Sequence, residues 1–138
     1  MNYKTSNIIF WISTSLIAIF EGIIPVLTFR SELAKEGIRH LGYPEYFGVM
    51  IVGFRICGVI ALIFPQLSPR IKEWAYAGFA IEFLAAAVSY MVIDGINFNF
   101  FIPLIVLAVL VVSYFSYHIK QKTVKQSLVP IGQQTGEV

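Results

Sequence analysis

Four long runs of apolar residues make up most of the chain, and short polar stretches separate them. The apolar positions form blocks and do not alternate with polar ones, which argues against half-buried strands. A helix needs roughly 20 mostly apolar residues to cross a bilayer. The pattern therefore predicts four transmembrane helices, at about residues 8–29, 45–64, 74–93 and 100–119.

Residues that end helices support these boundaries. Pro65 follows the second run, and Asp94 begins a short turn before the fourth. The first run contains Glu21 and is not followed by a small-residue cleavage site, so we expect a retained helix and not a signal peptide. We predict an all-α fold, a four-transmembrane-helix bundle over residues 1–120, followed by a polar, flexible tail over 121–138.

The connection between the first two runs is long for a turn within a bundle. Ser31 is suited to cap a short helix whose apolar side carries Leu33, Ile38 and Leu41. Such a helix would lie on the membrane surface or close the mouth of the bundle. An irregular loop fits the two turns of pattern equally well.

Composition changes the class of protein that the length alone would suggest. Of the 138 residues, 57% are hydrophobic and only 13% are charged, about half the charged share of a soluble domain. A formal charge of +2 without an arginine-rich stripe argues against nucleic-acid binding. The single cysteine, Cys57, excludes a dithiol within the chain, and two separated histidines make no metal site.

Lysine and arginine set the expected orientation, because they favour the cytoplasmic side of a membrane. Four spans place both termini on one side. That side carries six basic residues, and the other carries Arg30, Lys35 and Arg39. We therefore expect both termini in the cytoplasm and the bundle in the inner membrane. The six are Lys4, Arg70, Lys72, Lys120, Lys122 and Lys125.

Three charged residues fall inside the predicted spans: Glu21, Arg55 and Glu82. At a rise of about 1.5 Å per residue, Arg55 and Glu82 lie roughly 13 and 12 Å from the inner boundary, and Glu21 lies roughly 20 Å from it. Arg55 is thus expected to pair with Glu82, with Glu21, or with both. Pro25 has no N–H for the Glu21 carbonyl, which predicts a local kink there.

Neighbouring positions on the helix faces extend this polar interior. On the third span a stripe of small residues surrounds Glu82 and would let another helix approach closely, whereas Phe83 lies off the stripe in a flanking or lipid-facing position. On the fourth span Ser113 and Tyr117 present hydroxyl groups on one face. The stripe consists of Ala75, Gly78, Ala85, Ala86 and Ser89.

Two interpretations of the buried charges remain open. One is an ion pair that fixes helix register and does nothing else. The other is a midplane pocket that binds a small hydrophobic ligand or handles a proton, because two acids facing one arginine favour protonation of one acid. The ligand-binding or proton-handling candidates are Glu21, Arg55, Glu82, Ser89, Ser113 and Tyr117.

Two stretches, LGYPEYF at residues 41–47 and KEWAYAGF at 72–79, resemble the DoxX-like family of small membrane proteins, and the resemblance extends over roughly residues 11–117. It implies a four-helix integral membrane bundle. Each stretch also has an architectural meaning, since Tyr43 and Tyr76 suit the membrane interface. Two positions depart from the family pattern: Arg55 stands where lysine is more familiar, and Tyr90 stands where the family often has histidine.

The resemblance implies several roles, because the broader group includes members linked to quinol-oxidising or sulfur-redox complexes, and also scaffolds and assembly chaperones. We expect an accessory or binding protein without enzymatic activity of its own, and a quinone or lipid as its ligand. The alternatives are a membrane subunit of a quinol-linked oxidoreductase, a small proton-coupled transporter, and an assembly scaffold. Expected partners are membrane lipid, a second copy of the chain or a redox protein; no motif for a cofactor is present.

Overall fold

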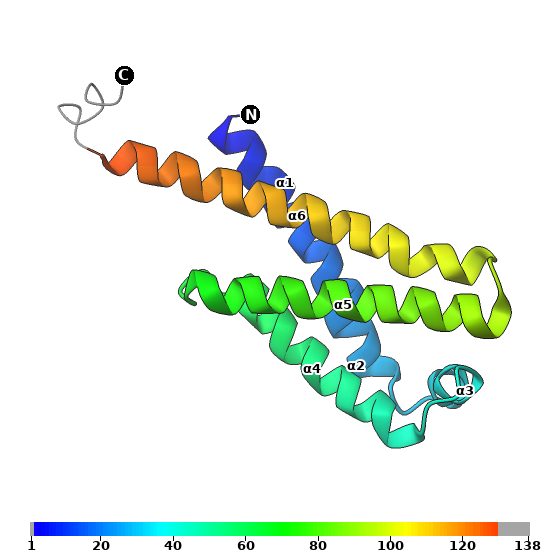
Figure 1. Ribbon diagram of the computed structural model, residues 1–138. Coiled ribbons are helices and arrows are strands. Elements are labelled where there is room, and N and C mark those ends of the chain that lie inside the picture. Colours follow the sequence, from blue (N-terminus) through cyan, green and yellow to red (C-terminus); the bar gives the residue numbers. More distant parts are fainter. Residues whose placement is uncertain (1, 130–138) are drawn as a thin grey trace.

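The computed structural model describes residues 2–129, and within that range the chain is a bundle of helices without strands (Figure 1). Four helical segments are long and apolar enough to cross a membrane: Tyr3–Thr28, Glu45–Ile63, Pro69–Asp94 and Phe98–Leu128. The predicted all-α fold with four helices able to span a membrane is therefore confirmed. The elements are α1 (Tyr3–Ile17), η1 (Ala18–Ile23), α2 (Ile24–Thr28), α3 (Glu32–His40), α4 (Glu45–Ile63), α5 (Pro69–Asp94) and α6 (Phe98–Leu128).

The first span changes its helical geometry at Glu21. Segments α1, η1 and α2 follow one another without a break, and η1 is a π-helix that contains the buried Glu21. Pro25 begins the α-helical segment that follows and has no N–H to donate to the carbonyl of Glu21. The helix is thus wider at the carboxylate, and the predicted kink stays a prediction.

Helix α6 is longer than the predicted fourth span. It continues to Leu128, so residues 121–128, which we expected to belong to a flexible tail, are helical. Lysine, glutamine and leucine are good helix formers and carry the helix beyond the apolar run. The rest of the predicted tail, residues 130–138, lies outside the described residues.

The first and last spans pack side by side in opposite directions. Ser6 of α1 donates a hydrogen bond to the carbonyl of Ser116 on α6 at 2.9 Å, and further along the pair Thr14 and Ser113 bond through their hydroxyls at 2.9 Å. Helix α5 lies along α6, and α4 lies on the far side of α5 (Figure 1). The start of α1 and the end of α6 consequently lie at the same end of the bundle.

The core contains several aromatic side chains, and the closest helix contact does not lie where the stripe of small residues predicted it. Phe79 and Phe83 of α5 are buried and stacked, with ring centroids 6.0 Å apart, so of the two positions expected for Phe83, flanking or lipid-facing, the lipid-facing one was wrong. Gly78 has no neighbour within 4 Å of an added Cβ, so the predicted close helix contact is absent at this position of the stripe on α5. The close approach occurs at Gly58 of α4, where an added Cβ would lie 2.7 Å from the Phe79 ring.

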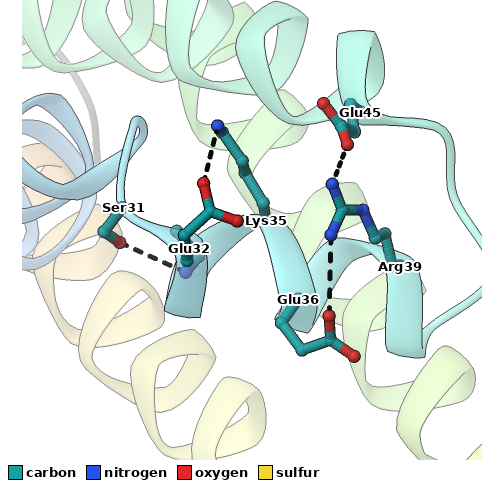
Figure 2. A network of polar contacts seen from close by, with 7 residues as sticks. Ser31, Glu32, Lys35, Glu36, Arg39 and Glu45 are labelled. Atoms are coloured by element: carbon teal, nitrogen blue, oxygen red, sulfur yellow. Dashed lines mark hydrogen bonds and ion pairs between the residues drawn. The ribbon is translucent and has the colours of Figure 1, made fainter.

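The long connection between the first two spans forms a helix, α3, and is not an irregular loop. The Ser31 hydroxyl accepts a hydrogen bond from the Ala34 N–H at 3.2 Å, as a cap does, and the segment is helical (Figure 2). Leu33 is 86% exposed, so it does not share with Ile38 the side of α3 that packs on the bundle; a position of Leu33 toward the membrane stays a prediction. Figure 1 shows α3 nearly end-on, turned away from the helices that cross the view.

Ion pairs hold α3 across the end of the bundle. Arg39 pairs with Glu36 on its own helix and donates to Glu45 at the start of α4 (Figure 2), and these carboxylates raise the pKa of the Arg39 guanidinium above its usual value. On the other side, His40 Nε2 lies 2.6 Å from Oδ1 of Asp94 at the end of α5. The helix is therefore tied to both α4 and α5.

Replacing Arg39 with alanine is expected to loosen α3. Loss of the contact with Glu45 removes one of the two ties, and an exposed pair of this kind corresponds to about a two- to fivefold change in an opening equilibrium. Amide hydrogen exchange over residues 32–41 should rise by that factor. The matched control is Lys35→Ala, whose partner Glu32 lies on α3 itself; equal exchange in the two variants would show that the Arg39 contact does not hold the helix.

Candidate functional site

Arg55 of α4 lies between two acidic side chains from different helices. Its Nε donates to Oε1 of Glu82 on α5 at 2.5 Å, and its Nη1 lies 3.1 Å from Oε2 of Glu21 in η1. The side chains of Arg55, Glu21 and Glu82 are 24%, 9% and 21% exposed. The sequence left open which acid would pair with Arg55, and the structure shows that both do.

These three residues share one cavity. It has a volume of 340 Å³ and lies between η1, α4, α5 and α6, beneath α3. Glu21, Arg55, Glu82 and Ser89 all line it, so four of the six candidate residues come together here. Its remaining walls are mostly apolar.

Two tyrosines that the sequence did not select as site residues also line this cavity. The hydroxyl of Tyr43 bonds the hydroxyl of Ser89 at 2.8 Å, and Ser89 donates to the carbonyl of Ala85 at 2.8 Å. Tyr90 stands where the family often has histidine. Tyr43 could have been identified as a site residue from its place in the LGYPEYF stretch. We had instead assigned this stretch to anchoring at the membrane interface.

A second cavity adjoins the first. It has a volume of 540 Å³, lies between α2, α3 and α4, and is lined mainly by apolar side chains such as Phe20, Ile24 and Val49. Both cavities are lined by Ala34, Ile38, Ile51 and Arg55. Arg55 therefore lies where the two cavities meet.

Ser113 and Tyr117 belong to a different part of the bundle. The Ser113 hydroxyl bonds Thr14 and Tyr76, each at 2.9 Å, and all three side chains are buried. Tyr117 accepts a hydrogen bond from Gln121 at 2.6 Å. Neither residue lines the cavity at Arg55, so the structure does not bring them to the other candidates. Tyr76, expected at the interface, is instead a buried hydrogen-bonding partner.

The charges at the site restrict what it can hold. With both acids ionised, one arginine and two glutamates sum to one net negative charge, which disfavours an anionic ligand. A guanidinium has five N–H donors, more than the two described contacts occupy. The site can thus donate hydrogen bonds to a neutral oxygen while the acids hold the guanidinium in place.

The four apolar helices and the helical bundle define a multi-pass membrane protein. The sequence profile of the DoxX-like family matches residues 9–113, which is most of the chain. The chain belongs to the DoxX-like family, as the LGYPEYF and KEWAYAGF stretches suggested. No curated protein and no solved structure gives a significant match to it.

Proposed function

We propose that this protein is a membrane-embedded accessory protein that binds a small hydrophobic molecule with a polar ring, of the quinone or quinol type. The observation that carries the proposal is the position of Arg55, which lines a 340 Å³ cavity together with both of its acidic partners. This volume lies within the range of roughly 300–1,000 Å³ that is usual for ligand pockets.

The chemistry of the lining supports a neutral ligand with ring oxygens. A carbonyl oxygen can accept from the guanidinium, and a ring hydroxyl can donate to a glutamate or to the hydroxyl pair of Tyr43 and Ser89. Apolar walls around a few polar groups are typical of such sites. With both acids ionised, a charged phosphate would meet the net negative charge of the group formed by Glu21, Arg55 and Glu82.

The adjoining 540 Å³ cavity supports a ligand that also has an apolar chain. A ring placed beside Arg55 would leave the cavity lined by Phe20 and Val49 for the chain, since the two cavities share Arg55 and Ile51. An ion pair that served helix register alone would need no space beside it, because close packing stabilises a bundle better than a void does.

The test is retention of a quinone by the purified protein. After extraction in a mild detergent, organic extracts should contain quinone, and added decylubiquinone should bind saturably. Tyr43→Phe removes one hydroxyl from the cavity and should weaken decylubiquinone binding about fivefold, the effect of one hydrogen bond.

The matched control is Tyr76→Phe, which removes a buried hydroxyl from the separate network with Ser113. This variant should bind decylubiquinone like the parent protein. Equal weakening in both variants would indicate a general loss of packing. Absence of any quinone binding by the parent protein would refute the proposal.

We also propose that the protein lies in the inner membrane with both termini in the cytoplasm. The start of α1 and the end of α6 share one end of the bundle, and that end carries Lys72 and Lys120. Basic residues favour the cytoplasmic side. Reporter fusions after Leu128 should therefore show cytoplasmic activity, and a reporter inserted beside Gly95 should show periplasmic activity; the reverse pattern would contradict the orientation.

A further inference from the structure

A basic cavity lies at the end of the bundle that holds the start of α1 and the end of α6. It has a volume of 290 Å³, and the residues that line it come from α1, α4, α6, the start of α5 and the turn before it. Three lysines, Lys72, Lys120 and Lys125, line it, and no carboxylate does among the residues described. It shares no lining residue with the two cavities at Arg55.

Lys72 is the deepest of these lysines. It is 4% exposed, its Nζ donates to the carbonyl of Leu62 at 3.0 Å, and it lies over the Tyr117 ring, 5.5 Å from the centroid. An ammonium group has three N–H donors, so one carbonyl does not satisfy it. The adjacent acid, Glu73, is engaged elsewhere, because its Oε1 lies 2.7 Å from Nε2 of His118.

Lys120 faces the same space from α6. Its Nζ lies 5.2 Å from the centroid of the Phe10 ring and 5.7 Å from that of Trp11. Two lysines thus rest on aromatic rings, and no anion among the described lining residues compensates them. Burying a cation without a counter-charge is costly, so a bound anion would stabilise this arrangement.

We propose that this cavity binds the phosphate group of an anionic phospholipid. Basic pockets between transmembrane helices at the membrane surface are suited to such head groups. The lining also contains Ile63 and Val124, which offer apolar surface to the glycerol and acyl chains. Lipid and free phosphate share the same anionic chemistry, and this apolar surface favours the lipid.

The test uses protein purified in a neutral detergent and mixed with equal amounts of phosphatidylglycerol and phosphatidylcholine. Lipid that remains after gel filtration is measured by mass spectrometry. The parent protein should retain phosphatidylglycerol in preference. Lys120→Gln should lower that preference about fivefold, the effect of one basic residue near an anionic surface.

The matched control is Lys122→Gln, which removes an identical charge from an exposed position on the same helix that does not line the cavity. It should leave the preference unchanged. Equal losses in both variants would reveal general surface attraction and overturn the proposal.

Lys125→Gln provides a second variant at an exposed position, so the proposal remains testable if Lys120→Gln fails to fold. It should also lower the preference about fivefold.

The source of the phosphate is tested by adding inorganic phosphate at millimolar concentration. If phosphate displaces phosphatidylglycerol and raises the melting temperature as much as the lipid does, the site binds a free anion and the lipid proposal fails.

Discussion

An Arg55→Leu protein is expected to be about 3–5 kcal/mol less stable than the parent. The substitution leaves Glu21 and Glu82 without the cation that both of them contact. Each acid must then be buried as an uncompensated charge or take up a proton, and both routes weaken the folded state. The free energy of unfolding is measured by titrating sodium dodecyl sulfate into mild-detergent micelles.

Two further variants distinguish the effect of the positive charge of Arg55 from the effect of the shape of its guanidinium group. Arg55→Lys keeps the positive charge but loses the planar fork that reaches both acids, so it should lose only about 1 kcal/mol. Adding Glu21→Gln and Glu82→Gln to Arg55→Leu removes every charge and should restore most of the lost stability. If Arg55→Leu is as stable as the parent, the ion pairs do not hold the helices together.

Gly58→Ala is expected to destabilise the bundle by about 1–3 kcal/mol, the usual effect of overpacking a core. The new methyl group would lie 2.7 Å from one atom of the Phe79 ring and 2.8 Å from another. The ring is buried and stacked on Phe83, so it cannot turn aside without disturbing that contact. The same detergent titration measures the loss.

Gly78→Ala is the matched control for this substitution. Gly78 lies in α5, and an added Cβ there would meet no atom within 4 Å. Since alanine favours helices more than glycine does, this variant should be unchanged or slightly more stable. Equal losses for both alanines would mean that the contact between Gly58 and Phe79 is not tight.

The sequence predicted the spans well because span length and apolar composition are set by the bilayer. It also predicted the ion pairs at Arg55, since depth follows from counting residues along a helix. It predicted, too, that Pro25 donates no hydrogen bond to the carbonyl of Glu21, because proline lacks the N–H that the ladder requires. Each of these properties depends on one helix, or on the depth of one helix compared with another.

Properties that depend on how helices rotate against each other were not predictable. Small residues on α5 suggested a close contact at Gly78, but the bundle uses Gly58 of α4 with a buried phenylalanine instead. Ser113 has a hydroxyl on the interior face of α6, as predicted, yet its partners are Thr14 and Tyr76. A face that points inward does not specify which of several neighbours it will meet.

Tyr43 illustrates the same limit within a recognisable stretch. An aromatic residue beside a proline at the end of a span is typical of an interfacial anchor. Its hydroxyl nevertheless reaches Ser89, forty-six positions along the chain, because α3 brings the end of the connection over α5. Only the folded path of that connection reveals this contact.

The π-helical turn over Ala18–Ile23 divides the first span into two helical frames. Each residue turns an α-helix by about 100°, and a π turn holds one residue more than the α turn it replaces. Side chains before and after the turn therefore cannot be placed on one common helical wheel. A single-residue deletion within η1 would convert the π turn into an α turn, so α2 would keep its orientation relative to α1 and Pro25 and Thr28 would still line their cavity.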